Sequence, residues 1–188
     1  IIGQINSSSL LKDKTEIIFV DNGSTDETPM MLKKALLELS SYNIRSIRIE
    51  KNIGYGNGIK EGIAVSTGEV ISWTHADLQT DINDIYIGYK KITRLVTTDF
   101  FLKGRRKRRS PLDSMLTLGM GVLSSILLRQ RLTDINAQPK MFHRSFLKFV
   151  KDPPLDFSFD LYFYYTAKKE RYNIIDIPVS FRKRKFGE

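Results

Sequence analysis

Glu16-Ile-Ile-Phe-Val-Asp-Asn-Gly-Ser-Thr-Asp26 is an apolar run that ends in an acidic, turn-forming cluster. Further along the chain, Glu69-Val-Ile-Ser-Trp-Thr-His-Ala-Asp-Leu-Gln79 repeats this arrangement. Each run predicts a strand followed by a polar turn. In open α/β sheets, ligands bind at the carboxyl ends of the strands. The two segments therefore predict a site for a polar, phosphorylated ligand and a divalent cation.

Strand-like runs alternate with helix-like runs outward from these two segments. Strands are expected at 16–21, 44–50, 69–74, 99–103, 140–143 and 173–181. Helices are expected at 29–39 with Thr28 as cap, and at 59–65, 81–95, 112–128 and 157–169. This alternation predicts one α/β domain whose mostly parallel sheet is covered by helices.

The composition is that of a globular protein with a strong positive charge. The 188 residues are 41% hydrophobic and 27% charged, with a net charge of +9 and no cysteine. The absence of cysteine excludes a disulfide framework and a thiolate zinc site. The charge predicts an anionic partner. No signal peptide is expected at Ile1, and the 112–128 stretch is shorter than the roughly 20 residues that span a bilayer.

The polar residues at the two strand ends are candidate ligand-binding groups. Asp21 suits hydrogen bonds from a nucleobase or a ribose, although a turn followed by a helix cap also explains Asp21–Asp26. His75, Asp77 and Gln79 lie on one side of an extended chain. The oxygen ligands suit Mg²⁺ or Mn²⁺, and the imidazole favours Mn²⁺. The alternative reading of this segment is a helix cap.

Two other segments allow more than one interpretation. Asn52-Ile-Gly-Tyr-Gly-Asn-Gly58 lacks the spacing of a dinucleotide fingerprint and predicts a tight loop that brings backbone close to a ligand. The basic run Gly104-Arg-Arg-Lys-Arg-Arg109 predicts a solvated face or loop, a phosphate-binding group or a contact for anionic lipid. The apolar 112–128 stretch that follows favours lipid over nucleic acid.

In this order, the segments resemble the family 2 glycosyltransferases of the GT-A fold, within them the dolichyl-phosphate mannose synthase and polyprenyl-phosphate sugar transferase branch. The resemblance rests on 16–29, 52–79, Gly104-Arg105, 134–142 and 177–187. It implies a Rossmann-like, mostly parallel sheet flanked by helices, without the family's first strand. It also implies one catalytic domain over 1–188, truncated at both ends relative to the family.

The resemblance implies roles for particular residues. Those expected to bind the sugar nucleotide are Asp21, Gly23, Ser24, Asn52, Gly54, Gly58, Lys60, His75 and Asp77. Those expected to hold the metal are Asp77, Gln79 and His75, where His75 replaces the first Asp of the family's Asp-x-Asp motif. Those expected to act in catalysis are Asp77, Asp134, Asp160, Arg105 and Arg184.

The function implied by the resemblance is that of an inverting, Mg- or Mn-dependent glycosyltransferase. It would move a sugar from a UDP- or GDP-sugar to a polyprenyl phosphate at the cytoplasmic face of an anionic membrane, without nucleic acid. One alternative is a glycan or other hydroxyl acceptor, which needs a general base from Asp134, Asp156 or Asp160. Another is a sugar-nucleotide-binding protein without catalysis, which His75 would favour.

Overall fold

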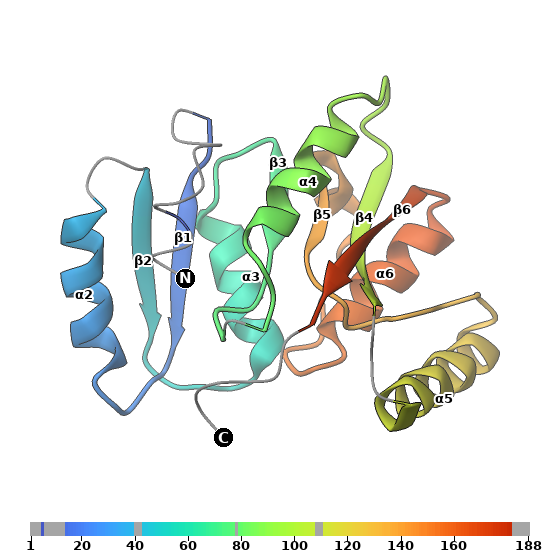
Figure 1. Cartoon of the computed structure of the whole chain (residues 1–188), viewed down its shortest axis with the longest axis horizontal. Helices are drawn as coiled ribbons and strands as arrows, with labels where there is room; N and C mark the ends of the chain where they lie inside the picture. Colours follow the sequence, from blue (N-terminus) through green and yellow to red (C-terminus); the bar gives the residue numbers. More distant parts are fainter. Residues whose placement is uncertain (1–4, 6–13, 40–42, 78, 108–110, 182–188) are drawn as a thin grey trace.

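The computed structural model describes residue 5 and residues 14–39, 43–77, 79–107 and 111–181, without the side chains of 111–118 and 120. Figure 1 shows the order of the elements along the chain. They are β1 (Ile17–Asn22), α2 (Thr28–Glu38), β2 (Ile44–Ile49), α3 (Tyr55–Val65), β3 (Val70–Trp73), α4 (Asn83–Ile92), β4 (Phe100–Lys107), α5 (Pro111–Leu128), β5 (Lys140–His143), η1 (Arg144–Phe149), α6 (Phe159–Lys169) and β6 (Asn173–Ser180).

The strands of the described ranges form two hydrogen-bonded sheets, β1-β2 and β3-β5-β4-β6. The pairs β1/β2 and β4/β6 are parallel, whereas β5 runs antiparallel to both β3 and β4. The α/β prediction is confirmed, but the sheet is mixed rather than mostly parallel. Because β5 is antiparallel, its first residue, Lys140, lies beside Trp73 at the end of β3 and beside Lys103 of β4.

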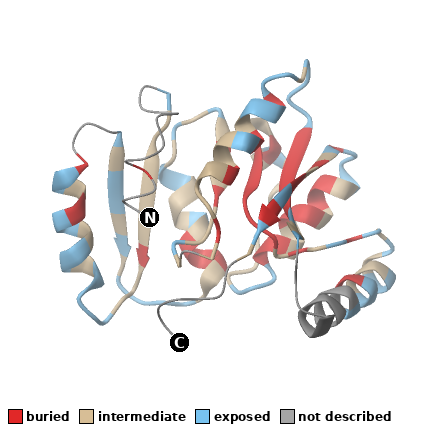
Figure 2. Ribbon diagram, viewed as in Figure 1, coloured by how far each residue is buried: buried red, intermediate tan, exposed pale blue. Residues whose placement is uncertain are grey.

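The buried core lies mainly in the larger sheet and the helices on its two faces, as the red regions of Figure 2 show. One cluster is aromatic: Trp73 of β3 packs edge-on against Phe142 of β5 and Phe163 of α6. A second cluster joins α4 to the other face through Leu102 and Ile92. Aromatic pairs at such angles add to the stabilisation that burial of their area gives.

Two helices begin differently from the sequence prediction. Thr28 is the first residue of α2 instead of its cap, and the Thr28 N–H donates to Asp26 Oδ1 at 3.0 Å. The prediction of Thr28 as cap was therefore wrong, because Thr28 is already helical and the Asp26 carboxylate, from outside the helix, accepts its N–H. Helix α3 begins at Tyr55 rather than at Ile59, so Gly56 and Gly58 are helical.

The basic run is part of a strand as far as the structure describes it. Strand β4 extends to Lys107, four residues beyond the predicted end, and pairs with β6 throughout. The loop interpretation of Gly104–Lys107 was wrong, because Arg105 pairs with Pro178 and Arg106 with Val179 in the ladder, although Arg105 and Lys107 are exposed to solvent on this strand. The rest of the run, 108–109, lies outside the described residues.

Helix α5 stands apart from the body of the protein at the lower right of Figure 1. Within the described residues, no helix is both long and apolar enough to cross a membrane. Exposed apolar side chains nevertheless gather on the last two turns of α5: Val122, Leu123, Ile126 and Leu127. An exposed apolar group of this kind marks an interaction surface.

Candidate active site

Most of the predicted site residues lie along one edge of the structure. Strand β1 ends at Asn22, β3 at Trp73 and β4 at Lys107, while β5 begins at Lys140. Trp73 and Lys103 are the two register partners of Lys140. The 134–139 segment therefore joins the edge, because it leads into an antiparallel strand.

Asp21 organises the turn after β1. Its side chain is buried, Oδ1 accepts the Ser24 N–H at 2.9 Å, and Oδ2 lies 3.2 Å from Arg48 Nη1. Arg48 also donates to the Ser24 carbonyl at 3.1 Å. The structure thus brings Asp21 and Ser24 together, with the Asp21 carboxylate bonded to protein groups as a turn-and-cap interpretation expects.

The turn after β1 is hydrogen-bonded to the segment before α3. Asn22 Nδ2 donates to Asn52 Oδ1 at 3.1 Å and to the Gly54 carbonyl at 3.0 Å. Gly23 has a φ of 75°, and a Cβ there would stand 2.6 Å from the Asn52 nitrogen. Only glycine combines that φ with that approach at little cost. Gly23, Asn52 and Gly54 are therefore neighbours, and their sugar-nucleotide role stays a prediction.

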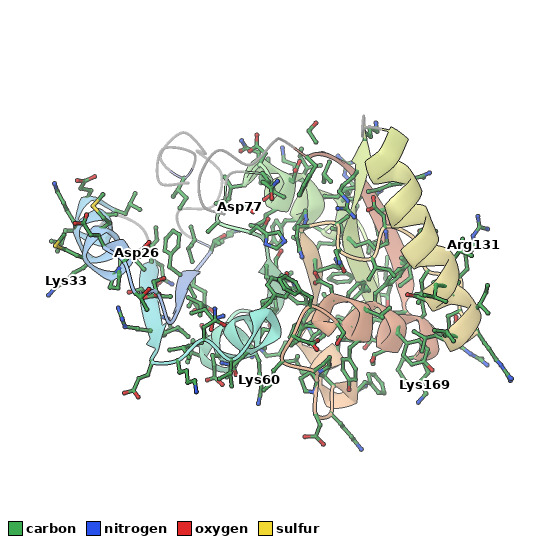
Figure 3. All side chains as sticks on the ribbon, turned by 90° about the horizontal axis from the view of Figure 1, so that it is seen from below. Asp26, Lys33, Lys60, Asp77, Arg131 and Lys169 are labelled. Carbon is green, nitrogen blue, oxygen red and sulfur yellow. The ribbon has the colours of Figure 1, made fainter. Side chains whose placement is uncertain are left out.

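The glycines of the α3 segment pack against protein. A Cβ on Gly54 would meet the Leu155 carbonyl oxygen at 2.2 Å, and one on Gly56 would meet the Pro154 carbonyl oxygen at 2.6 Å. The close backbone approach expected here therefore occurs, but its partner is the chain itself. Lys60 is exposed on α3, and that helix lies between the labelled Lys60 and Asp77 in Figure 3.

His75 and Asp77 follow directly after β3 and are both half-buried. Asp77 Oδ1 accepts the Gln79 N–H at 3.0 Å. The His75 ring stacks on Tyr55 with centroids 5.5 Å apart. Burial lowers the pKa of His75 below its ordinary value, and the carboxylates of Asp77 and Asp160 offset only part of that shift. The imidazole is therefore neutral near pH 7, the form that binds metals.

These side chains fit a metal ion whose coordination is completed by the phosphates of the substrate. No group of three or more His, Asp and Glu side chains that could hold an ion exists in the described parts of the chain. Asp77 offers one carboxylate, beside the neutral imidazole of His75. Magnesium and manganese sites of transferases typically use one or two carboxylates plus the phosphates of the substrate.

Arg106 and Asp134 form an ion pair that the sequence did not single out. Asp134 Oδ1 accepts from Arg106 Nε at 2.7 Å, and Asp134 Oδ2 accepts the Arg106 backbone N–H at 2.6 Å. The two side chains are only 9% and 13% exposed, whereas Arg105 is exposed. Strand alternation, which turns neighbouring residues to opposite faces, was the available signal. Arg184 lies outside the described residues.

Asp156 and Asp160 occupy opposite environments. Asp156 is exposed and accepts the Ser158 N–H at 2.8 Å, which with the Ser158 hydroxyl lowers the pKa of Asp156. Asp160 is 1% exposed and bonds to three side chains that the sequence did not predict for the site. These are Tyr55, Trp73 and Gln138.

Comparison with known sequences supports a transferase family. The family model described as "Glycosyl transferase family 2" matches residues 5–170. A dolichyl-phosphate beta-glucosyltransferase of Dictyostelium discoideum is 27% identical over 90% of this chain and 56% of its own. An undecaprenyl-phosphate 4-deoxy-4-formamido-L-arabinose transferase of Enterobacter sp. is 38% identical over 40% of this chain and 23% of its own. The chain thus spans about half the length of the dolichyl-phosphate relative, and its match to the arabinose transferase covers 23% of that protein.

Solved structures of low sequence identity share the fold. A mannosyltransferase from Pyrobaculum calidifontis, solved with GDP-Man and Mn²⁺, has a TM-score of 0.70 at 18% identity over 99% of this chain and 53% of its own. Glucosyl-3-phosphoglycerate synthase from Mycobacterium tuberculosis, solved with Mn²⁺ and UDP-Glc, has a TM-score of 0.68 at 16% identity over 100% and 68%. The fold is GT-A, and the chain belongs to glycosyl transferase family 2.

Proposed function

We propose that this chain is the transferase part of an enzyme that moves a sugar from a nucleoside diphosphate to a polyprenyl phosphate, with inversion at the sugar. The names of the relatives support the acceptor class. The observation that carries the proposal is that all three candidate bases already accept hydrogen bonds from the protein: Asp134, Asp156 and Asp160.

A hydroxyl acceptor needs a free base within hydrogen-bond reach. Asp134 is held by Arg106, and Asp160 is buried. Asp156 is accessible, but its lowered pKa makes it a weak base. A phosphate acceptor is already anionic and needs no proton removed, so this arrangement favours it over a hydroxyl.

The reaction then joins one oxygen of the acceptor phosphate to the anomeric carbon of the sugar. The bond from that carbon to the donor diphosphate breaks, and the nucleoside diphosphate leaves with the electron pair. Arg105 is exposed on β4 at the site edge and would stabilise the charge of the diphosphate or the acceptor phosphate. The turn formed by Asp21, Ser24 and Asn52 would hold the nucleoside.

A divalent cation would be held by Asp77 and His75, with Gln79 beside them, and would supply charge stabilisation on the diphosphate when bound. The neutral imidazole favours Mn²⁺ over Mg²⁺. Solved GT-A structures that contain Mn²⁺ support this assignment.

A membrane surface is the proposed location of the acceptor, at the cytoplasmic face. The exposed apolar residues of α5 offer the contact, with Ile126 and Leu127 69% and 72% exposed. Arg131 is exposed just beyond that helix, as Figure 3 shows. Each such cation adds about 1 kcal/mol of attraction to an anionic surface.

The test is sugar transfer by the full-length protein in membranes, from a panel of radiolabelled UDP- and GDP-sugars. We expect label in the lipid extract, lost with chelator and in Asp77→Ala. The matched control is Asp99→Asn, which changes an exposed aspartate at the opposite end of β4 and should leave transfer unchanged.

The other results would each replace the proposal. Label only in water-soluble product would mean a hydroxyl acceptor. Nucleotide binding without transfer from any donor would mean a binding protein without catalysis.

A further inference from the structure

The carboxylate of Asp160 is the centre of a buried polar network. Oδ1 accepts the Trp73 Nε1–H at 3.1 Å, and Oδ2 accepts the Gln138 amide at 2.9 Å and the Tyr55 hydroxyl at 3.2 Å. The partners come from α3, β3 and the segment before β5, so one side chain of α6 ties together the elements that form the site edge.

A buried cation balances this carboxylate. Lys140 Nζ lies 3.7 Å from Asp160 Oδ1, and the two side chains are 0% and 2% exposed. Lys140 also donates to the carbonyls of Ile135 and Ala137, each at 2.7 Å. A buried charge is stable only when it is paired and hydrogen-bonded, and here both conditions hold.

These contacts leave Asp160 poorly placed to exchange a proton with a substrate. A general acid or base must come within hydrogen-bond reach of the reacting group. Both Asp160 oxygens instead face donors of the protein, and the residue is 1% exposed.

The network does reach the residues proposed for the metal. Tyr55, which donates to Asp160, stacks one face on His75 and lies 5.3 Å from the Phe157 ring. Trp73 is the last residue of β3, two positions before His75. Asp160 therefore fixes both the ring against which His75 packs and the strand from which His75 emerges.

We propose that Asp160 is a positioning residue: through Tyr55 and Trp73, and balanced by Lys140, it holds His75 and Asp77 in the arrangement that binds the metal and the donor diphosphate. This inference rests on the proposed function. It assigns Asp160 a role different from the catalytic one that the sequence suggested, and it adds Tyr55, Trp73 and Lys140 to the residues on which the reaction depends.

The surroundings of Gln138 allow two substitutions of Asp160 to be compared. Gln138 Oε1 is buried and, within the described residues, has no hydrogen-bond partner. In Asp160→Asn, the new amide oxygen can accept from Trp73, while the new NH₂ can donate to the Tyr55 oxygen or, once the Gln138 amide turns over, to Gln138 Oε1. Asp160→Asn therefore keeps hydrogen bonds within the network but removes the negative charge that balances Lys140, whereas Asp160→Ala removes both.

The experiment measures two quantities in the full-length protein: kcat and KM for the sugar nucleotide, and Mn²⁺ affinity with nucleoside diphosphate from the EPR signal of free Mn²⁺. We expect Asp160→Asn to stay within about tenfold of wild type in kcat/KM and about twofold in Mn²⁺ affinity. Asp160→Ala should lower kcat/KM at least a hundredfold and Mn²⁺ affinity at least tenfold. Tyr55→Phe keeps the ring but not the hydroxyl, so it should weaken Mn²⁺ binding severalfold even if Asp160→Ala does not fold.

The inference is overturned if Asp160→Asn loses kcat as completely as Asp160→Ala while Mn²⁺ affinity is unchanged in Asp160→Asn and Tyr55→Phe. That pattern is expected of a catalytic acid or base. Failure of the proposed function looks different, because the wild-type protein itself would then transfer no sugar to lipid. The Mn²⁺ measurements still test the positioning role in that case.

Discussion

At the scale of single residues, two neighbouring arginines have different surroundings. Arg106 turns inward to Asp134, while Arg105 on the other face of β4 is exposed. The positive φ of Asp134, 48°, belongs to the conformation that presents its carboxylate to both the side chain and the backbone of Arg106. Aspartate tolerates this conformation better than most residues.

We expect Arg106→Ala to lower the free energy of unfolding by about 3 kcal/mol, since it leaves a largely buried carboxylate without its cation. Arg105→Ala, a matched change on the exposed face, should stay within about 0.5 kcal/mol of wild type. Urea denaturation measures both. Equal midpoints for the two variants would contradict the structural role of Arg106.

Lys140 gives a prediction of pH dependence. Burial lowers the pKa of Lys140 from 10.5 to about 8. Between these values the unfolded chain binds more protons than the folded protein, so the free energy of unfolding rises with pH, by at most about 1.4 kcal/mol per unit. Measured relative to Lys140→Met, which lacks this group, wild type should gain stability from pH 8 to pH 10.

The control for that measurement is Lys60→Met, a change at an exposed lysine. The difference in free energy of unfolding between Lys60→Met and wild type should stay constant across the same pH range. A flat difference for Lys140→Met as well would mean that Lys140 keeps its ordinary pKa in the folded protein.

At the scale of elements, α3 is fixed by glycines that allow its first turn to touch the 154–155 backbone. A Cβ on Gly56 would meet the Pro154 carbonyl oxygen at 2.6 Å and the Phe159 ring at 2.8 Å. Because Tyr55 is in the same turn, the placement of α3 also determines where the ring beside His75 lies.

We expect Gly56→Ala to destabilise the protein by about 1–3 kcal/mol, as overpacking of a filled site does. Gly119→Ala on α5 is the control: outside its own helix, no described atom lies within 4 Å of its Cβ position, so alanine should stabilise that helix by up to about 1 kcal/mol. Thermal unfolding compares the two. A stabilising effect of Gly56→Ala would show that the contact with Pro154 is not tight.

At the scale of the whole molecule, a net positive charge accompanies an exposed apolar surface at the end of α5. The net charge of +9 and the exposed end of α5 together predict binding to anionic vesicles. Ile126→Glu with Leu127→Glu should weaken that binding at least tenfold, since burying each such side chain contributes about 1.5–3 kcal/mol.

Met30→Glu with Met31→Glu is the matched control, because those residues are similarly exposed on α2 but far from α5 in Figure 1. Co-sedimentation with phosphatidylserine vesicles measures binding of the wild type and both variants. Equal losses in the two double variants would mean that added negative charge, and not the α5 surface, controls binding.

The order of the described strands and α-helices could be predicted from the sequence, because hydrophobic periodicity is a local property, whereas the short helix η1 was missed. The sequence also located Asp21, His75 and Asp77 at strand ends, since strands that end in polar turns are readable from short windows. The extent of the domain over 1–188 stays a prediction.

Which polar groups meet could not be read from the sequence, because the partners come from segments far apart in the chain. Asp160 lies 105 residues from Tyr55 and 87 from Trp73, and Arg106 lies 28 from Asp134. A glycine suited to a ligand and a glycine suited to a neighbouring backbone also look the same in sequence. These outcomes depend on how distant segments pack at the sheet edge, because desolvation and pairing of charged groups are set by packing.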